Sequence, residues 1–184
     1  MLSKKVNNAA YKTTIDVGAG KIKQITWYFC NVFFLKNTLV VSSGLKVFIL
    51  RLFGATVGKG VIIKPGVNIK YPWKLTIGDD CWIGEKVWID NLSEVVTGTS
   101  VTLSQNSMIL TGSHDPTKET FDFISLPVIL EEGVWIGAGA VVYGGITVGS
   151  HAILGINAVA ENNMQPFTIY KGNPAVPVIK RHIT

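Results

Sequence analysis

Branched aliphatic residues recur at almost every sixth position in the hexads of residues 57–160. The residues that open successive hexads are Val57, Ile63, Ile69, Ile77, Ile83, Ile89, Thr97, Leu103, Ile109, Leu130, Ile136, Val142, Val148, Leu154 and Ala160. A mostly small residue follows four positions later, at Val61, Val67, Cys81, Val87, Ser93, Val101, Ser107, Ser113, Val134, Ala140, Ala152 and Ala158. A period of six fits neither an α-helix nor an alternating strand, and it indicates a repeat architecture.

A six-residue repeat of this kind builds a parallel β-helix. Each hexad supplies a short strand and a turn, and three hexads close one triangular coil. The aliphatic residues then stack into a core column, and the small residues fit the crowded corners. The sequence therefore predicts an all-β solenoid of about five coils. A period of six is known in left-handed helices, although periodicity alone does not determine the hand.

Two short breaks in the period and one long break fall at the same corner of the predicted prism. The first three predicted coils are residues 57–74, 77–94 and 97–114. The extra pairs Leu75-Thr76 and Val95-Val96 follow the first two coils, and an excursion of residues 115–129 follows the third. His114 is the last residue before this excursion. Because insertions on one face of a solenoid often mark its binding face, this edge is the candidate site.

Residues 1–56 differ from the repeat region in pattern and are predicted to form a basic N-terminal segment with a helical cap. Residues 1–23 are polar and rich in lysine, and we expect them to be loosely ordered. Bulky apolar residues over 25–52 predict one or two helices, the last of them over 44–54. Residues 57–184 are predicted to form the β-helix and a C-terminal tail.

The function of the helical cap is open to two interpretations. The cap can pack on the body of the protein, or it can rest as an amphipathic segment on a membrane, with Lys36, Lys46 and Arg51 near anionic headgroups. The charge distribution accommodates both interpretations. Residues 1–74 carry twelve basic residues and one acidic residue, a net charge of +11, whereas residues 75–184 carry five basic and eleven acidic residues, a net charge of −6.

Composition excludes several classes of protein. The 184 residues are 47% hydrophobic and 16% charged, which argues against intrinsic disorder. Cys30 and Cys81 lack CxxC spacing, so we expect free thiols. The chain has no uncharged apolar run long enough to span a membrane and no secretory-signal layout, which together favour a cytoplasmic protein. The lysines are spread singly and accompany no nucleic-acid-binding motif, so nucleic acid is not an expected partner.

His114 is the leading candidate for chemistry, because it lies between a glycine turn and the predicted excursion. Histidine is the natural general base near neutral pH, since its unperturbed pKa is ~6.5. A solvated histidine at a turn is the alternative, and His151 and His182 are expected to be of that kind. The three histidines lie far apart in the sequence, and their spacing does not suit a metal site.

Several motifs together resemble the left-handed β-helix, or hexapeptide-repeat, O-acetyltransferases. They are the hexads, Leu110-Thr-Gly-Ser-His-Asp115, Trp135-Ile-Gly137 and Lys171-Gly-Asn-Pro-Ala175. More narrowly, the chain is similar to the colanic-acid type of exopolysaccharide acetyltransferase. This likeness is carried by Arg51-Leu-Phe-Gly-Ala55, Tyr71-Pro-Trp73, Ile77-Gly-Asp79 and Trp82-Ile-Gly84. The resemblance covers residues 45–181.

The resemblance implies a left-handed fold and a homotrimer that binds acetyl-CoA in a groove between neighbouring prisms. It also implies that His114 deprotonates an acceptor hydroxyl, which then attacks the thioester directly. Asp90 and Asn91 match a family position near the acceptor. Trp135 is either a wall of the substrate site or a structural aromatic at a corner of the prism.

The resemblance further assigns contacts to CoA. Ala138 and Ile156, which are separated by one full predicted coil, are placed along the pantetheine arm, where backbone groups make the contacts. The other cofactor-binding candidates are Lys171, Gly172, Asn173, Pro174, Lys180 and Arg181. Many relatives carry a basic residue where this chain has Val176, so the three basic candidates are the substitutes that can meet a CoA phosphate. Solvated charges of the tail are the alternative.

The sequence thus predicts an acetyl-CoA-dependent O-acetyltransferase that acts on a sugar hydroxyl in exopolysaccharide biosynthesis. We expect a cytoplasmic homotrimer without a metal, in peripheral contact with the inner face of the membrane if its acceptor is a lipid-linked saccharide. One alternative is an acetyltransferase of the same fold that acts on serine, a free sugar or an antibiotic. Another is a non-catalytic β-helix scaffold at the membrane.

Overall fold

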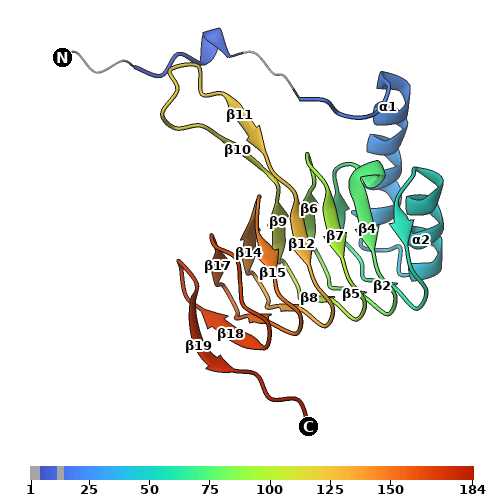
Figure 1. Ribbon diagram of the computed structural model, residues 1–184. Helices are drawn as coiled ribbons and strands as arrows, with labels where there is room; N and C mark the ends of the chain where they lie inside the picture. Colours follow the sequence, from blue (N-terminus) through green and yellow to red (C-terminus); the bar gives the residue numbers. More distant parts are fainter. Residues whose placement is uncertain (1–4, 12–14) are drawn as a thin grey trace.

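Short parallel strands wind into a β-helix (Figure 1). Their buried aliphatic side chains form a single column inside it. The structure is a computed structural model that describes residues 5–11 and 15–184, so that Lys4 and Lys12 of the predicted basic segment lie outside the described residues. All fifteen hexad openers are buried, which confirms the core column predicted from the period of six. Of the small residues, Ser93 is only partly buried and Ser113 is exposed, because both lie at the corner where the chain departs from the coil.

Three parallel sheets form the faces of the prism. The first contains β1 (Thr56–Val57), β4 (Leu75–Ile77), β7 (Val95–Thr97), β12 (Val128–Leu130) and β15 (Thr147–Val148). The second contains β2 (Ile62–Ile63), β5 (Trp82–Ile83), β8 (Thr102–Leu103), β13 (Trp135–Ile136), β16 (Ile153–Leu154) and β18 (Thr168–Lys171), with β19 (Val176–Lys180) antiparallel to β18. The third contains β3 (Asn68–Ile69), β6 (Trp88–Asp90), β9 (Met108–Leu110), β14 (Val141–Tyr143) and β17 (Val159–Ala160).

The strand register locates the residues that interrupt the period. Val57 pairs with Ile77, whereas Leu130 pairs with Val148, so the first coil is longer than the regular coil near the C-terminus. The insertions lie at one corner, as predicted, but the predicted extra pairs are wrong in detail. Leu75-Thr76 and Val95-Val96 are strand residues of β4 and β7, and the added length is accommodated by the turns before them. The first of these turns contains the 3₁₀ helix η3 (Pro72–Lys74).

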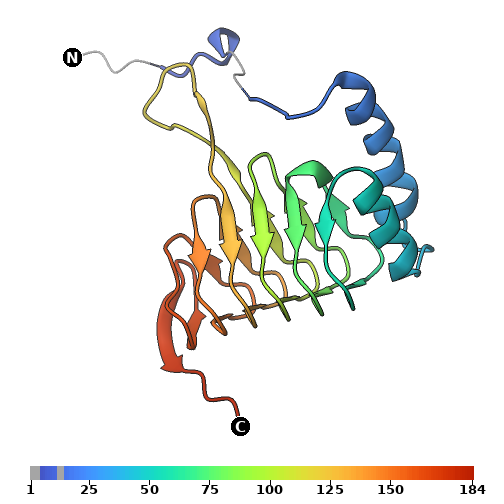
Figure 2. The same ribbon diagram turned by 45° about the vertical axis from the view of Figure 1, so that its right-hand side comes forward.

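The long excursion is a β-hairpin that projects from the same corner (Figure 2). Its strands are β10 (Gly112–His114) and β11 (Phe123–Ser125), and His114 pairs with Phe123. The excursion therefore begins before His114 and not after it, and residues 128–130 have already returned to the first sheet. His114 therefore belongs to the hairpin, because the pairing of β10 with β11 continues the strand structure beyond the last hexad.

The N-terminal helices cover the open end of the first coil (Figure 1). They are α1 (Lys21–Cys30), the π-helix η2 (Asn31–Leu35) and α2 (Ser43–Leu52). Ser42 caps α2 by accepting a hydrogen bond from the backbone N–H of Leu45. Trp27 and Leu50 bury their side chains, and the indole N–H of Trp27 donates to the carbonyl of Ile69 at 3.0 Å. Burial of these apolar residues covers an edge that would otherwise expose the core.

Part of the segment that precedes α1 has defined contacts with the hairpin. The 3₁₀ helix η1 (Asn8–Ala10) lies near the hairpin tip, and the N–H of Asn7 donates to the carbonyl of Glu119 at 2.8 Å. We expected the whole of residues 1–23 to be loosely ordered. In the described part, Asn7 and Tyr11 contact the hairpin, the carbonyls of Asp16 and Val17 accept hydrogen bonds from the side chains of Lys74 and Trp73, and the chain enters α1 at Lys21.

Two of the three cations expected to face membrane headgroups are tied to the protein instead. The Lys46 side chain is fully buried, and its Nζ donates to the carbonyl of Lys64 at 2.9 Å and to that of Ile63 at 3.4 Å. This burial lowers the pKa of Lys46. Arg51 donates to the carbonyl of Val57, with Nη2 at 2.7 Å. The side chain of the third cation, Lys36, is exposed.

Within the described residues, no helix combines the length and the apolar character that crossing a membrane requires.

Candidate functional site

The imidazole of His114, which lies on the hairpin, packs against three aromatic rings. The ring of Phe121 stacks on it at 4.4 Å between centroids, and the ring of Phe123 meets it edge-on at 5.5 Å. Tyr11, from the N-terminal segment, approaches to 5.7 Å. Apolar packing of this kind restricts the rotation of the imidazole, so that its free edge points in one direction.

A backbone carbonyl determines which nitrogen of His114 is free. His114 Nδ1 lies 2.8 Å from the carbonyl oxygen of Phe121. A carbonyl only accepts hydrogen bonds, so the network assigns the proton of the neutral imidazole to Nδ1. Nε2 then carries the lone pair. This is the arrangement required of a general base, with the carbonyl in the orienting role that a carboxylate has in other enzymes.

His114 and Asp90 line one cavity of about 420 Å³, which we call the histidine cavity. Its lining residues are Tyr11, Ile15, Lys70, Asp90, Leu92, Gly112, Ser113, His114 and Phe123. The structure thus brings together the predicted base and one predicted acceptor contact from different coils. A carboxylate accepts hydrogen bonds from hydroxyl groups, so Asp90 is suited to orient a polyhydroxylated ligand beside the imidazole.

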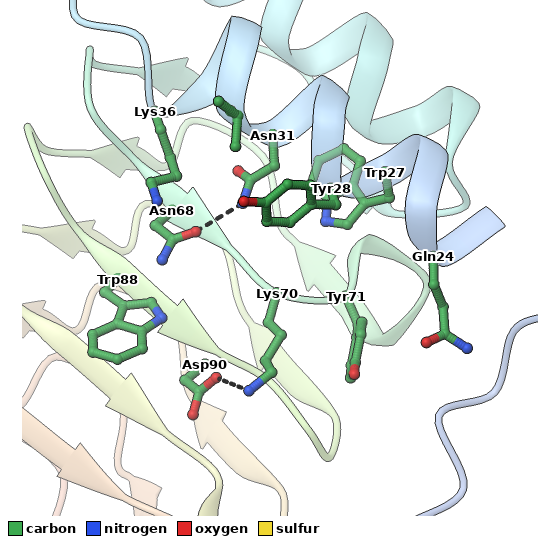
Figure 3. Close-up of a pocket in the computed structure, with 11 residues that line it drawn as sticks. Gln24, Trp27, Tyr28, Asn31, Lys36, Asn68, Lys70, Tyr71, Trp88 and Asp90 are labelled. Atoms are coloured by element: carbon green, nitrogen blue, oxygen red, sulfur yellow. Dashed lines mark hydrogen bonds and ion pairs between the residues drawn. The ribbon is translucent and has the colours of Figure 1, made fainter. Parts of the chain in front are cut away.

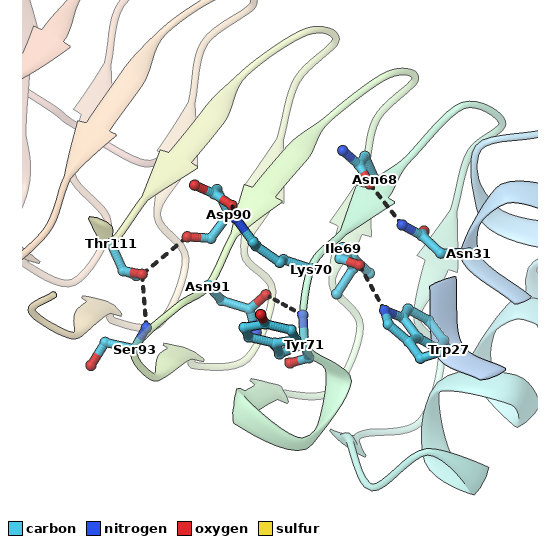
Figure 4. Close-up of polar contacts among 10 residues, drawn as sticks. All are labelled: Trp27, Asn31, Asn68, Ile69, Lys70, Tyr71, Asp90, Asn91, Ser93 and Thr111. Atoms are coloured by element: carbon cyan, nitrogen blue, oxygen red, sulfur yellow. Dashed lines mark hydrogen bonds and ion pairs between the residues drawn. The ribbon is translucent and has the colours of Figure 1, made fainter. Parts of the chain in front are cut away.

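Asn91 does not line the histidine cavity, in contrast to the sequence-based expectation. Its side chain is 0% exposed. Its Oδ1 accepts from the N–H of Tyr71 at 3.0 Å (Figure 4). Its Nδ2 donates to the carbonyls of Tyr71 and Lys74 at 2.6 and 3.2 Å. Every one of these bonds is to the turn of the preceding coil. Asn91 therefore supports the corner that carries Asp90, and its burial argues against direct contact with a substrate.

Other polar side chains near His114 are also engaged within the protein. Thr111 donates to the carbonyl of Asp90 at 3.0 Å and accepts from the N–H of Ser93 at 2.9 Å, which ties two coils together (Figure 4). Asp115 accepts from the hydroxyl of Thr117 at 2.6 Å and from its N–H at 2.9 Å. These hydrogen bonds lower the pKa of the Asp115 carboxyl group.

A second cavity, of about 460 Å³, lies on the second sheet; we call it the Trp135 cavity. Its lining residues are Trp135, Gly137, Ile153, Leu154, Gly155, Ile156, Ile169 and Lys171. Three predicted residues, Trp135, Ile156 and Lys171, meet here. The indole N–H of Trp135 donates to Ser104 Oγ at 2.8 Å, which fixes the ring as a wall. Trp135, expected either as a wall of the substrate site or as a structural aromatic, lines this cavity together with CoA candidates, because its strand is on a different sheet from His114.

The remaining CoA candidates do not line this cavity, and their contacts differ. The N–H of Asn157 donates to the carbonyl of Ala138 at 2.9 Å, so Ala138 and Ile156 are on adjacent coils, as predicted. Lys180 Nζ donates to the hydroxyl of Thr168 at 2.8 Å. Arg181 Nη1 donates to two backbone carbonyls, those of Gly133 at 3.1 Å and His151 at 3.0 Å. Of the three basic candidates, only Lys171 lines the cavity.

Gly172, Asn173 and Pro174 form the exposed turn between β18 and β19. Val159 on β17 donates its N–H to the carbonyl of Gly172 at 3.0 Å and accepts from the N–H of Ala175 at 2.8 Å. The turn is therefore docked on the last coil next to the strand that carries Lys171.

A third cavity, of about 360 Å³, lies between the helical cap and the third sheet; we call it the Trp88 cavity (Figure 3). Its lining residues are Gln24, Trp27, Tyr28, Asn31, Val32, Lys36, Asn68, Lys70, Tyr71, Trp88 and Asp90. Sequence reasoning missed most of them. The sequence contained one indication of this cavity. Asn68 and Trp88 are register partners on successive coils, and Lys70 and Asp90 are separated by the same number of residues, so both pairs are expected on the same face of the prism.

Among residues 5–11 and 15–184, no three or more histidine, cysteine, aspartate or glutamate side chains are grouped to hold a metal ion. Cys30 and Cys81 are free thiols.

No protein-family model matches the chain. The chain is 34% identical over 164 residues to the putative colanic acid biosynthesis acetyltransferase WcaF of Escherichia coli, in an alignment that covers 89% of this chain and 90% of that protein. It is 25% identical over 123 residues to the galactoside O-acetyltransferase of the same organism, which covers 65% of this chain and 61% of that protein.

Solved structures share the fold. A hexapeptide-repeat acetyltransferase of Vibrio cholerae complexed with acetyl coenzyme A superposes with a TM-score of 0.79 at 18% identity, over 89% of each chain. A maltose O-acetyltransferase from Clostridium difficile gives 0.79 at 23% identity, over 88% of each chain. The β-helix is accordingly the left-handed one that the resemblance in sequence implied.

Proposed function

Because the chain belongs to the hexapeptide-repeat O-acetyltransferases, we propose that it transfers an acetyl group from acetyl-CoA to a sugar hydroxyl during exopolysaccharide assembly. The observation that carries this proposal is the geometry of His114. Its Nδ1 is bound to a carbonyl, and its Nε2 is left available in a cavity that also contains Asp90. An imidazole oriented in this way takes the proton of an acceptor hydroxyl as that hydroxyl attacks an acyl group.

The Trp135 cavity suits the co-substrate, because its walls are mainly apolar side chains with one cation at the edge. Bound there, acetyl-CoA would supply an acetyl thioester. Trp135 and Ile156 would pack against the apolar part of the pantetheine arm, and Lys171 would pair with a phosphate group. Asp90 would orient the acceptor by accepting hydrogen bonds from its hydroxyl groups, so that one hydroxyl faces His114 Nε2.

The two cavities have no lining residue in common within one chain. His114 is on the hairpin at the corner between the third and first sheets, whereas the Trp135 cavity is on the second sheet. We infer a homotrimer in which the Trp135 cavity of one protomer faces the histidine cavity of its neighbour. This arrangement explains why the acid–base group and the apolar cavity, which direct transfer requires to be adjacent, are apart in the single chain.

The proposal is tested by the release of CoA from acetyl-CoA with nucleotide sugars, lipid-linked oligosaccharides, free sugars, serine and an antibiotic as acceptors. Turnover restricted to saccharides supports it. Equal turnover on serine would favour the alternative of a small-acceptor enzyme, and the absence of turnover with every acceptor would favour a scaffold.

Replacing Ile156 by aspartate is expected to raise the KM for acetyl-CoA at least ~10-fold, which corresponds to ~1.4 kcal/mol. The carboxylate would lie in an apolar cavity and would repel the anionic coenzyme. Ile179→Asp is the matched control, because Ile179 is also exposed but lies on β19 outside the lining of the cavity. An unchanged KM in Ile156→Asp, or an equal rise in both variants, would remove acetyl-CoA from this cavity.

The helical cap is proposed to rest on an anionic membrane surface. Its surface exposes many large apolar side chains: Ile22, Ile25, Phe29, Phe33, Phe34, Leu39, Val41, Leu45, Phe48 and Leu52. An apolar face of this extent on a soluble domain indicates a binding surface. Exposed Lys21 and Lys36 lie on the same part of the chain, and residues 1–74 carry a net charge of +11. Apolar side chains combined with cations match the interface of an anionic bilayer.

Phe33→Asp is expected to lower the partition of the protein onto phosphatidylglycerol-containing vesicles ~10-fold in co-sedimentation, since burial of one phenylalanine contributes ~1.5–3 kcal/mol. The control is Val178→Asp, which alters a similarly exposed apolar residue at the opposite end of the β-helix. Equal binding to purely phosphatidylcholine vesicles would contradict the electrostatic part of the proposal. Concentration-dependent self-association that Phe33→Asp abolishes, without vesicle binding, would assign this face to a second copy of the chain.

A further inference from the structure

The Trp88 cavity contains a buried polar atom without a partner. Asn31 is only 8% exposed, and its Nδ2 donates to Asn68 Oδ1 at 2.7 Å (Figure 3). Its Oδ1 has no hydrogen-bond partner among the described residues. An unsatisfied buried acceptor costs ~1–3 kcal/mol, so it requires an explanation. A ligand that donates a hydrogen bond from a hydroxyl group would satisfy it.

Aromatic rings form part of the lining of this cavity. The indole of Trp88 is 40% exposed and lies on β6, while the phenol of Tyr28 is exposed on α1 (Figure 3). A pocket that combines exposed aromatic faces with a few polar atoms suits a ligand that is apolar on its faces and polar at its edges. A sugar ring has this character, because its C–H groups lie on its faces and its hydroxyl groups at its edge.

The Trp88 cavity adjoins the histidine cavity. Lys70 and Asp90 line both, and Lys70 Nζ lies 3.0 Å from Asp90 Oδ1. A ligand bound beside His114 and longer than one sugar ring would therefore continue past the Lys70–Asp90 pair towards Trp88.

We propose that the Trp88 cavity binds the sugar residue next to the one that is acetylated, with Trp88 as the stacking surface and Asn31 Oδ1 as a hydroxyl acceptor. An oligosaccharide is then a better acceptor than a monosaccharide. This inference rests on the proposed function, since it extends the acceptor site that begins at His114.

The test compares acceptors of different length with variants of two similar tryptophans. The probes are de-O-acetylated colanic acid fragments, either single sugars or short oligosaccharides, assayed by acetyl transfer and, without acetyl-CoA, by calorimetric binding. Trp88→Ala is expected to raise the KM and the Kd for the longer fragments ~10-fold, as for an aromatic residue at the centre of a binding site. The KM for acetyl-CoA and the weak turnover of the monosaccharide should remain unchanged.

Trp82→Ala is the matched control. Trp82 is 43% exposed on β5 of the same coil and lines neither cavity. The inference is overturned if wild-type protein binds single sugars and longer fragments equally, as it would if the cavity held water only, or if Trp88→Ala weakens both equally. Absence of acetyl transfer to any saccharide by the wild-type protein would instead refute the proposed function, while calorimetry would still test whether Trp88 binds the longer fragments.

Discussion

His114→Ala is expected to lower kcat for acetyl transfer by ~10²–10⁴-fold, the usual contribution of a positioned general base. The imidazole is the side chain whose unprotonated nitrogen is oriented by the protein, through the bond of 2.8 Å between Nδ1 and the carbonyl of Phe121. Alanine leaves the acceptor hydroxyl without a group to take its proton. The KM for acetyl-CoA should change little, because the residues proposed to contact the coenzyme, Trp135, Ile156 and Lys171, are unaltered. Steady-state kinetics with saturating acetyl-CoA measures kcat, and a titration of acetyl-CoA measures its KM.

The fold should tolerate this substitution. His114 is only partly buried and lies on a projecting hairpin, outside the core column. A melting temperature close to the wild-type value, and an unchanged oligomeric state, would show that the loss is chemical. His182→Ala, in the exposed C-terminal tail, is the control and should retain full activity. Full activity in His114→Ala would refute the assignment of the general base.

The hexad pattern was sufficient to predict the β-helix, because each position in the repeat has one environment. The residue that opens each hexad, such as Ile83, points into the core column, so the period alone predicts that this position is buried. The same logic places Ala138 beside Ile156. It also predicts that insertions at one corner gather on one edge, from which His114 projects.

The period does not determine what happens where it is interrupted. Asn91 follows the last residue of β6. Only the structure shows that its side-chain amide is hydrogen-bonded to the backbone of Tyr71 and Lys74. From the sequence, Lys46 is expected to be a surface cation in an apolar helix, yet its Nζ donates a hydrogen bond to a backbone carbonyl of the first coil. The Trp88 cavity is likewise formed where the helical cap meets the third sheet, through contacts that no local pattern encodes.

The glycines at the corners lead to the largest expected effect on stability. At Gly78 an added Cβ would clash with the carbonyl oxygen of Gly98 and would lie 2.8 Å from the backbone nitrogen of Thr99. These are backbone atoms of the next coil, which cannot rotate away as a side chain can. Parallel strands are ~4.8 Å apart, so the two coils would have to separate or the corner would have to distort.

Gly78→Ala is therefore expected to lower the free energy of unfolding by ~3 kcal/mol, at the upper end for overpacked sites. For a chain of this length such a loss corresponds to a decrease in melting temperature of ~6–12 °C, measurable by calorimetry or circular dichroism. Gly44→Ala is the matched control: an added Cβ there has nothing within 4 Å, and the residue lies inside α2. Because alanine favours the helix over glycine by up to ~1 kcal/mol, this variant should be as stable as the wild type or more so. Equal stability of the two variants would mean that the coils can move apart at no cost, and close stacking at this corner would then not limit the stability of the β-helix.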